Sequence, residues 1–432
     1  MKRVGREHGT LVPGCVSACG DCGAMQQDVM LSPPKYDQDR PLLCAFPRNV
    51  SSFAVVFWLY TLVSATGAAS SDSLAFPASS DSAAPPSLGE IVVTARSLSP
   101  PSTIFEISRA DMETRGVRTV AEALETVPGV TVSVGRKNEV AVQLRGADPK
   151  RVLVLLDGRP MNMPYYGKID LRTVPVDRVE RIKVLLGAAS LLYGPNAAGG
   201  VINIITRRGP GHEAVSAGID IGVSPYAPEA LHDDGTCSGG AFCAGELGRW
   251  HWSASIGADR SSGFFLPAGY DPPAYVAQRG GLRDNSDYAV LNAEGSVGLR
   301  AGDQFEAAVA GGYHVEEKGI PADIYHPEYN RFDDWRRSFV DIMTRVAVGG
   351  SGRVKGRLYY DALRNLYVTY AGASFDSVTN RSLHENWDWG AELFGDMPIG
   401  PTTLAGSARI RQDVANVRRA DTARWQTYEI VS

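Results

Sequence analysis

The stretch that most constrains the fold of this chain runs from Leu192 to Thr206 and reads L-Y-G-P-N-A-A-G-G-V-I-N-I-I-T. Its two adjacent glycines, Gly199 and Gly200, allow a tight bend or the close approach of another backbone. The next five residues, from Val201 to Ile205, are apolar at all positions but one, which predicts a strand buried on both faces. Taken alone, the stretch predicts a buried strand after a loop, so its meaning depends on the rest of the chain.

A series of short motifs precedes this stretch. They are E-I-V-V-T-A from Glu90 to Ala95, V-P-G-V from Val127 to Val130, L-R-G from Leu144 to Gly146, V-L-V-L-L-D-G-R-P from Val152 to Pro160 and P-V-D-R-V-E-R-I-K-V from Pro175 to Val184. In this order and spacing, the motifs resemble the plug domain of the TonB-dependent outer-membrane receptors. From Gly89 to about Gly209 the resemblance holds motif by motif. The later part of the chain is similar to the family only in its general sequence pattern.

The resemblance implies an α/β plug domain at residues 103–209, followed by a partial antiparallel transmembrane β-barrel at residues 210–432. The residues that match the plug motifs are Arg145, Gly146, Asp157, Gly158, Glu180, Arg181, Tyr193, Gly194, Gly199, Gly200 and Asn203. The chain departs from the family pattern at Leu186, where Arg is common, at Ala188, where Pro is frequent, and at Pro195, where Ser is frequent. A contact between plug and barrel through position 186 is therefore not expected.

Residues 1–69 form the expected leader. Its apolar core, Phe53 to Val63, follows Arg48 and precedes small residues up to Ala69, which is typical of a secretory signal with cleavage near Ala68 or Ala69. A buried core helix is the alternative reading of this block. About fifty residues precede the apolar core, so a start codon assigned too early, with Met30 as the true start, is a further expectation.

Composition and cysteine spacing exclude several classes of protein. A net charge of -5 with 21% charged residues indicates neither disorder nor a nucleic-acid partner, and no apolar run reaches the eighteen residues of a membrane helix. Cys15, Cys19 and Cys22 have a spacing that resembles the cluster-binding loop of radical SAM enzymes, and Cys44 adds a fourth thiol nearby. They precede the export signal and no matching barrel follows, so no metal or cofactor is expected. Cys237 and Cys243, six apart in a glycine-rich loop, predict a small disulfide.

Residues 70–102 are expected to be a flexible tether, because Ser70 to Leu88 is rich in Ser, Ala and Pro. A short β-branched segment on such a tether can add itself as an edge strand to another protein's sheet. In the resembled family this segment is the TonB box, which the energy-transducing protein TonB binds in the periplasm. It consists of Glu90, Ile91, Val92, Val93, Thr94 and Ala95. The alternative is that Ile91 to Thr94 forms the first strand of the plug itself.

The plug itself is predicted as a small α/β unit. Ser108 can cap a helix that ends near Gly116, and Thr119 with Glu122 forms a capping box for a second helix that Pro128-Gly129 stops. Strands are expected at Val130 to Val134, Val140 to Leu144 and Val152 to Leu156, the last leading into the turn at Asp157-Gly158. No histidine lies between Ile104 and Gly211 and no catalytic or phosphate-binding motif is present, so an enzyme is not expected.

Arg145, Glu180 and Arg181 are the plug charges that the sequence singles out. Within a polar barrel lumen, such side chains can pair with charges of the wall and hold the plug by bonds that a mechanical pull could break. Solvated surface charge is the alternative.

After Arg208-Gly209 the pattern changes to an alternation with period two, which predicts strands with one apolar and one polar face. On one such strand Phe305, Ala307, Val309, Gly311 and Tyr313 alternate with Glu306, Ala308, Ala310, Gly312 and His314. On another, Val354, Leu358, Tyr360 and Ala362 alternate with Lys355, Arg357, Tyr359 and Asp361. On a third, Trp387, Trp389, Ala391 and Leu393 alternate with Asp388, Gly390, Glu392 and Phe394. A soluble sandwich is the alternative, but a lipid-facing band around a wet lumen suits the pattern better.

Connection lengths also fit a barrel, in which short periplasmic turns alternate with long outer loops. The expected short turns lie at 301–303, 350–352 and 400–401, and the long loops at 260–286 and 316–338. With an additional short strand at 240–247, this gives about ten strands of the roughly twenty-two that such transporters use. The residues expected to contact ligand in the second long loop are Tyr325, Tyr329 and Trp335.

The resemblance implies an energy-coupled importer in the outer membrane of a Gram-negative bacterium. Its partners would be TonB, outer-membrane lipid and an extracellular ligand, a ferric siderophore first, with cobalamin, haem or an oligosaccharide as alternatives. A signal-transducing receptor is less suited, because such relatives carry an extra domain before the TonB box. A non-functional fragment, truncated by a frameshift or at a sequence boundary, or a passive plugged pore is the remaining alternative.

Overall fold

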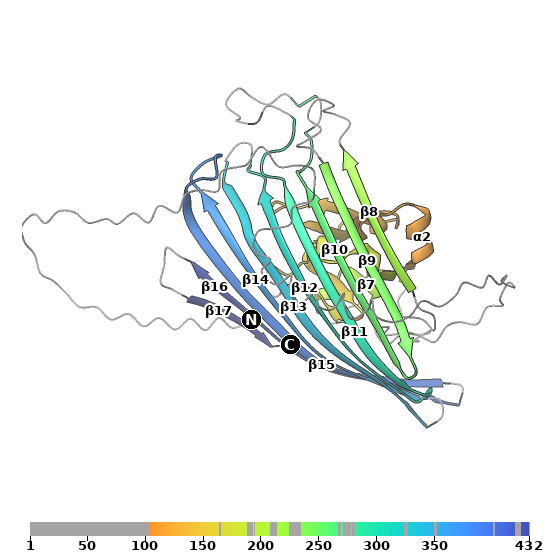
Figure 1. The fold of residues 1–432 in the computed structure, drawn as a ribbon. Helices are drawn as coiled ribbons and strands as arrows, with labels where there is room; N and C mark the ends of the chain where they lie inside the picture. Colours follow the sequence, from red (N-terminus) through yellow and green to blue (C-terminus); the bar gives the residue numbers. More distant parts are fainter. Residues whose placement is uncertain are drawn as a thin grey trace, which may run out of the picture. The chain divides into compact units, whose positions relative to one another are not determined.

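The computed structural model describes residues 103–163, 166–187, 193, 195–207, 214–223, 235–266, 269–270, 278, 281–323, 327–349, 352–400, 402–419 and 425–431. An α/β plug is followed by a ten-stranded antiparallel sheet, and the plug lies against one face of that sheet (Figure 1). The predicted leader, tether, TonB box and early cysteines lie outside the described residues. They remain predictions.

The plug is built on a five-stranded sheet in the order β1-β6-β7-β4-β5. Its strands are β1 (Thr103–Ser108), β4 (Val152–Leu156), β5 (Arg159–Pro160), β6 (Val179–Leu186) and β7 (Gly200–Thr206). β7 lies in the middle, antiparallel to β6 and parallel to β4. Most of its side chains are buried, which confirms the prediction of a strand covered on both faces.

Gly199 and Gly200 bring β7 into close contact with its neighbours, as the sequence predicted. A Cβ on Gly200, whose φ is +137°, would lie 2.5 Å from the Leu185 carbonyl oxygen and 2.6 Å from Leu144 Cδ1. A Cβ on Gly199 would lie 2.7 Å from that of Ala147. Both positions therefore require glycine for packing, and Gly200 also requires it for its backbone conformation.

Two short helices and a hairpin complete the described part of the plug. The helices are α2 (Arg109–Thr114) and α3 (Val120–Glu125), and the hairpin joins β2 (Val130–Val134) to β3 (Val140–Leu144). Four 3-10 turns lie at η1 (Pro149–Arg151), η2 (Leu171–Thr173), η3 (Val176–Arg178) and η4 (Pro195–Ala197). The strands β2, β3 and β4 begin and end at the residues that the sequence predicts.

The helix caps are close to those that the sequence predicts. Ser108 begins α2 and exchanges two hydrogen bonds with Asp111 in a reciprocal capping box. Thr119 begins α3 and accepts a hydrogen bond from the Glu122 backbone N–H, but the Glu122 carboxylate accepts from Arg118 N and not from Thr119. The second predicted box is therefore only half formed.

The large sheet consists of strands that follow one another in sequence and pair antiparallel with their neighbours. They are β8 (Ala214–Val223), β9 (Gly235–Leu247), β10 (Trp250–Ser261), β11 (Tyr288–Ala301), β12 (Phe305–Ile320), β13 (Tyr329–Val348), β14 (Gly352–Tyr370), β15 (Val378–Ile399), β16 (Thr402–Arg419) and β17 (Trp425–Val431). Only a few residues separate β11 from β12, β13 from β14 and β15 from β16, which agrees with the short connections that the sequence predicts. We call the edge with these connections the turn end of the sheet, and the opposite edge the loop end.

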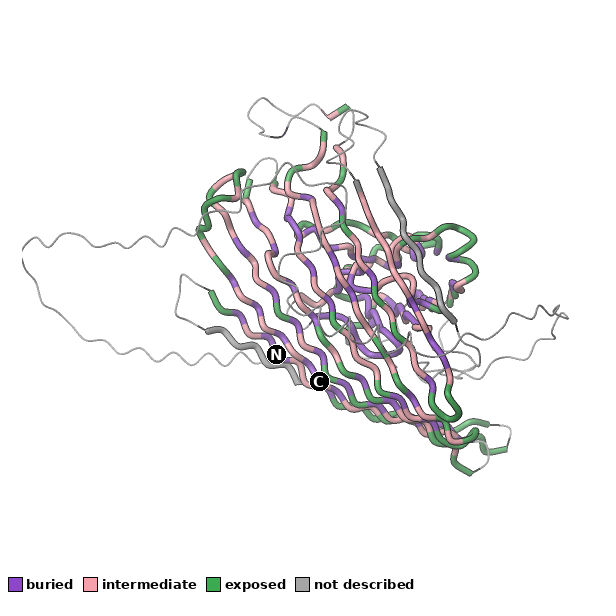
Figure 2. The backbone as a smooth tube through the Cα atoms, in the orientation of Figure 1, coloured by how far each residue is buried: buried purple, intermediate pink, exposed green. Residues whose placement is uncertain are grey.

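Burial alternates along the strands, as Figure 2 shows. On β12, Phe305, Val309 and Tyr313 are exposed, whereas Glu306 and His314 are buried. The polar positions therefore face the plug and the apolar positions face outward, in agreement with the predicted alternation. We call the plug-facing side of β8 to β17 the strand wall.

Two predictions about loops are wrong. Both cysteines lie within β9, which extends well before the predicted short strand and is continuously paired with β10. Six residues of extended strand separate Cys237 from Cys243 by about 20 Å, whereas a disulfide requires Cα atoms within about 7 Å. The predicted disulfide in an outer loop does not form.

The predicted loop at 316–338 is mostly strand, because β12 runs to Ile320 and β13 begins at Tyr329. Trp335 is only 3% exposed and packs within the strand wall, so it is not a loop residue. Tyr329 lies at the loop end of β13, and Tyr325 lies outside the described residues.

Candidate functional site: the contact between plug and strand wall

Charged side chains of the plug meet charged side chains of the strand wall in a largely buried interface. The contacts fall into three groups. We call them the β12 group, the Asp361 group and the aromatic group.

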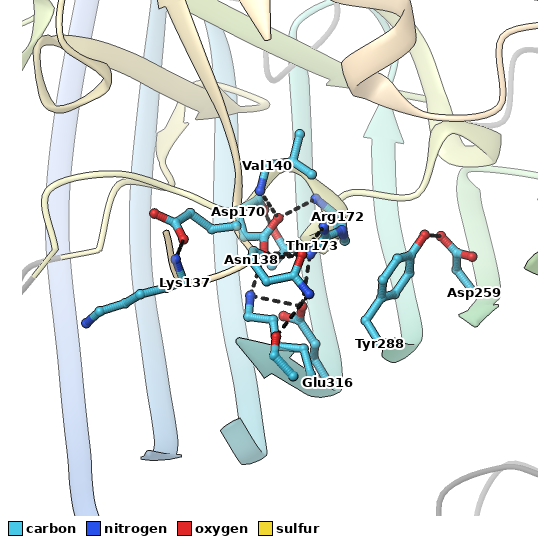
Figure 3. Close-up of polar contacts among 12 residues, drawn as sticks. Lys137, Asn138, Val140, Asp170, Arg172, Thr173, Asp259, Tyr288 and Glu316 are labelled. Carbon is cyan, nitrogen blue, oxygen red and sulfur yellow. Dashed lines mark hydrogen bonds and ion pairs between the residues drawn. The ribbon is translucent and has the colours of Figure 1, made fainter. Parts of the chain in front are cut away.

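The β12 group is centred on Asp170 of the plug, at the start of η2. The Lys318 ammonium lies 2.6 Å from the Asp170 carboxylate and 3.0 Å from that of Glu316, and all three side chains are fully buried. Arg172 lies 3.6 Å from Asp170 and 3.9 Å from Glu316. Figure 3 shows Asp170 and Arg172 of the plug close to Glu316 of β12. Two cations thus face two anions, which is how buried charges are tolerated.

Asn138 connects the same group to the backbone of the wall. Its side-chain amide donates to the carbonyl oxygens of Ser286 at 3.2 Å and Gly319 at 3.0 Å. Arg172 in turn donates to the Asn138 side-chain oxygen at 3.0 Å. Burial is the largest influence on Arg172 and by itself lowers its pKa, but Asp170 and Glu316 outweigh it and the pKa is raised.

The Asp361 group is centred on a carboxylate of β14. Arg159 of the plug, the first residue after the Asp157-Gly158 turn, forms a buried ion pair with Asp361. Arg337 of β13 donates to the same carboxylate at 2.9 and 3.0 Å and also to the Met161 carbonyl oxygen of the plug at 3.2 Å. One carboxylate therefore joins a plug cation to a wall cation. Removing one partner of such a buried pair typically costs about 3 to 5 kcal/mol.

Two more arginines strengthen this region. Arg178 of η3 forms an ion pair with Glu294 of β11, and Arg357 of β14 donates to the Asp157 carbonyl oxygen while its Nε lies 3.0 Å from Asp341. A cavity of about 40 Å³ lies between these contacts. It is large enough for ordered water.

The aromatic group lies nearer the loop end. The Tyr166 ring of the plug stacks on His384 of β15 with a centroid separation of 5.8 Å, and the Lys137 ammonium lies 4.2 Å from the Tyr166 ring centre. Met163 packs in an apolar cluster with Phe332, Trp335 and other wall residues. Burial is the largest influence on the pKa of Lys137 and lowers it below its ordinary value.

Most predicted plug residues have structural roles within the plug. Asp157 and Gly158 have φ values of +51° and +87° and form the two-residue turn between β4 and β5. The Asp157 carboxylate accepts from Thr206 N at 2.9 Å and Thr206 Oγ1 at 2.6 Å, and Asn203 accepts from Gly158 N at 3.0 Å. The turn that carries Arg159 is thereby attached to β7.

Arg145 and Gly146 also adopt positive φ and form the turn after β3, where Arg145 N donates to the Gly129 carbonyl oxygen at 2.7 Å. The Tyr193 carbonyl oxygen accepts from Arg409 of β16 at 3.3 Å, and Gly194 lies outside the described residues.

Of the charges that the sequence singled out, Arg145 and Glu180 are exposed, and Arg181 lies 3.8 Å from Glu106 of the plug. The role expected of these three residues stays a prediction. Ion pairs between plug and wall are seen at Arg159, Asp170, Arg172 and Arg178, which sequence reasoning missed. The one available signal was the polar face of the predicted strand that contains Arg357 and Asp361.

The described residues contain no group of three or more His, Cys, Asp or Glu side chains placed to hold a metal ion. None of their helices has the length and hydropathy needed to cross a membrane.

Comparison with known proteins places the plug in a family. A family model described as the TonB-dependent receptor plug domain matches residues 96–201. The vitamin B12 transporter BtuB of Photobacterium profundum is 27% identical over 234 residues, which are 52% of this chain and 35% of that protein. The iron-regulated outer membrane virulence protein of Vibrio cholerae is 41% identical over 115 residues, 25% of this chain and 18% of that protein.

Solved structures show the same fold over a larger part of the chain. The siderophore receptor PirA from Acinetobacter baumannii matches with a TM-score of 0.57 at 19% identity, covering 72% of this chain and 48% of that one. The copper transporter OprC matches with a TM-score of 0.59 at 14% identity, covering 72% and 47%. The chain thus spans about half the length of these structures, and the match covers 35% and 18% of the two curated relatives.

Proposed function

This chain carries the plug domain of the TonB-dependent receptors and, after it, strands with the fold of their barrels, and on that premise we propose that it serves energy-coupled import across the outer membrane of a Gram-negative bacterium. A scarce extracellular ligand would bind at the loop end, TonB would pull on the segment Glu90 to Ala95, and the plug would shift to let the ligand pass. No covalent chemistry is required.

The observation that carries this proposal is the seating of the plug by buried ion pairs, above all Arg159 with Asp361 and Asp170 with Lys318. Such pairs hold the plug in a defined position because an unpaired buried charge is costly. They are also non-covalent, so a pull from the periplasm can separate them and they can form again. A plug with these contacts suits a gate better than a permanent seal.

A ferric siderophore is the first ligand to test. The β2–β3 turn presents the exposed Arg136 next to Lys137, and Lys137 lies over the rings of Tyr166 and Tyr367. Cations beside aromatic rings suit an anionic aromatic chelate. Cobalamin is the second candidate, because the relative matched over the longest segment named above is a vitamin B12 transporter. Haem and oligosaccharides remain as further ligands.

Uptake measurements test the coupling. The receptor gene that carries this chain would be expressed in a host lacking its own receptors, and uptake of ferric enterobactin and of cyanocobalamin would be measured. Val92→Pro removes a backbone donor needed for strand addition and should abolish uptake, whereas Val92→Ala keeps that N–H and should retain it. Unchanged uptake with Val92→Pro would contradict the coupling role.

The same measurement separates transport from the remaining alternative. A non-functional fragment or a passive plugged pore would bind ligand or leak it without dependence on TonB. Uptake that is equal in hosts with and without TonB would favour that alternative.

A further inference from the structure

The cavity of about 40 Å³ between plug and strand wall brings arginines of the plug next to serines of the wall. The arginines are Arg159, Arg178 and Arg207, and the serines are Ser253 and Ser255 of β10 and Ser296 of β11. Guanidinium groups only donate hydrogen bonds, and each hydroxyl has one proton to donate. The cavity therefore has hydrogen-bond donors on both of its sides.

Two of these arginines have a buried nitrogen that no acceptor satisfies. Arg159 Nη2 and Arg178 Nε are buried and have no hydrogen-bond partner. The two side chains are only 1% and 5% exposed, although each forms an ion pair through its Nη1, Arg159 with Asp361 and Arg178 with Glu294. Buried donors of this kind are rare in folded proteins. A further acceptor between plug and wall would satisfy them.

The carboxylates of the cavity lining already have other partners. Asp157 accepts from Thr206 N at 2.9 Å and from Thr206 Oγ1 at 2.6 Å. Asp341 accepts from Arg357 Nε at 3.0 Å, and Glu294 forms the ion pair described above. The negative charge of each carboxylate is thus directed at groups that stabilise it, which reduces its repulsion of an incoming anion.

The environment of Arg178 also favours additional negative charge. Burial is the largest influence on its pKa and, together with the neighbouring Arg159 cation, outweighs the effect of Asp157, so the pKa falls to about 9. An anion beside Arg178 would offset both effects. The wall adds a donor, because the Ser253 and Ser296 hydroxyl oxygens lie 2.7 Å apart and their mutual hydrogen bond uses only one of two protons.

A small anion suits this space better than water does. One water molecule requires roughly 10–15 Å³ of such a cavity, so an ion somewhat larger than water fits within about 40 Å³. Water would add two donors of its own, whereas the carboxylates around it already have partners. A halide ion only accepts, and it can contact several N–H and O–H groups at once.

We propose that this cavity binds a small inorganic anion, chloride first, between Arg159 and Arg178 of the plug and the serines Ser253, Ser255 and Ser296 of the wall. The plug supplies the guanidinium groups and the wall supplies the hydroxyls, so the site is complete only while the plug is seated. An anion that binds the seated state alone stabilises that state by mass action. This inference does not depend on the proposed import function.

Diffraction with bromide locates the anion. Crystals of the receptor would be grown with about 0.15 M bromide, a physiological ionic strength, and the anomalous signal of bromine would be mapped. We expect a peak in the cavity within hydrogen-bond distance of Arg159 Nη2 or Arg178 Nε. A cavity that holds only water, without an anomalous peak, would overturn the proposal.

Proteolysis of the plug measures the effect in solution. Detergent-solubilised receptor would be digested in sodium chloride and in sodium gluconate, each at about 0.15 M. Cleavage of a transiently released plug follows the population of the released state, which a bound anion lowers by the factor 1 + [L]/Kd. We expect cleavage to be at least about threefold slower in chloride.

Serine variants assign this effect to the cavity. Ser255→Ala with Ser296→Ala removes two hydroxyls with little change in volume and should abolish the difference between chloride and gluconate. Ser338→Ala, at an exposed position of β13, is the matched control and should retain the difference. If the double variant fails to fold, the unmodified receptor still decides. Equal cleavage in the two salts would overturn the proposal, and a bromide peak without a chloride effect would mean binding at crystal concentration only and would overturn it too.

Discussion

Arg159 of the plug and Asp361 of β14 form an ion pair in which the two side chains are only 1% and 3% exposed. Asp361 is also the acceptor for Arg337, which in turn binds the plug backbone at Met161. The position of the plug against the wall therefore depends strongly on a single carboxylate.

Replacing Asp361 with Ala should destabilise the receptor by about 3 to 5 kcal/mol, because two buried guanidinium groups lose their shared partner. Thermal unfolding in detergent and protease sensitivity of the plug would measure the change. Arg364→Ala is the matched control, since its ion pair with Asp334 is half exposed and should contribute at most about 1 kcal/mol. Similar losses for both variants would contradict a dominant role for Asp361.

Gly200→Ala should destabilise the plug by at least about 1 to 3 kcal/mol, because the new methyl group meets a carbonyl oxygen and the backbone has a positive φ. Gly406→Ala on β16 is the control, since a Cβ there meets nothing within 4 Å. The comparison of the two unfolding temperatures checks the prediction. Equal temperatures would mean that the close approach at β7 can relax without cost.

Ser108→Ala should cost the plug about 1 kcal/mol at neutral pH through loss of the α2 cap. Hydrogen bonds from Ser108 lower the pKa of Asp111, so this stabilisation is present above the ordinary Asp range and is lost as the pH falls through the lowered pKa. The difference in stability between wild type and variant should therefore shrink in acid. A difference that is constant with pH would contradict the reciprocal cap.

Both β9 cysteines should be present as thiols. Denatured receptor treated with a maleimide, without prior reduction, should take up label at Cys237 and Cys243 alike, as measured by mass spectrometry of the peptides. If both cysteines take up label only after reduction, they form a disulfide, and the strand geometry that excludes it is contradicted.

Local signals predicted the plug well. The Gly199-Gly200 bend, the Asp157-Gly158 turn and strands β2, β3 and β4 depend on neighbours in sequence, so their residue types are enough to place them. The alternation on β12, β14 and β15 likewise showed which side chains face the plug. Strand lengths were less predictable, because β15 reaches 22 residues and extends well past the roughly ten that cross a bilayer.

The plug-to-wall partners could not be found from the sequence. Arg159 and Asp361 are separated by 202 residues, and only the packing of plug on sheet decides that these two charges meet. The β9 error has a different cause. The glycine-rich C-S-G-G-A-F-C has low strand propensity and reads as a loop, but pairing with β8 and β10 on both sides holds it extended. Trp335 was wrongly predicted to lie in a loop, because its acidic and aromatic neighbours in the sequence are typical of one.

Cross-linking the plug to the wall tests most directly whether the plug must move during import. In a receptor with Cys237→Ser and Cys243→Ser, Arg159→Cys and Asp361→Cys would be joined by a short, reducible bis-thiol reagent, and uptake of ferric enterobactin and cyanocobalamin would be measured before and after reduction. The account predicts that uptake is lost in the cross-linked receptor and returns on reduction. Undiminished uptake through a fully cross-linked receptor would contradict it.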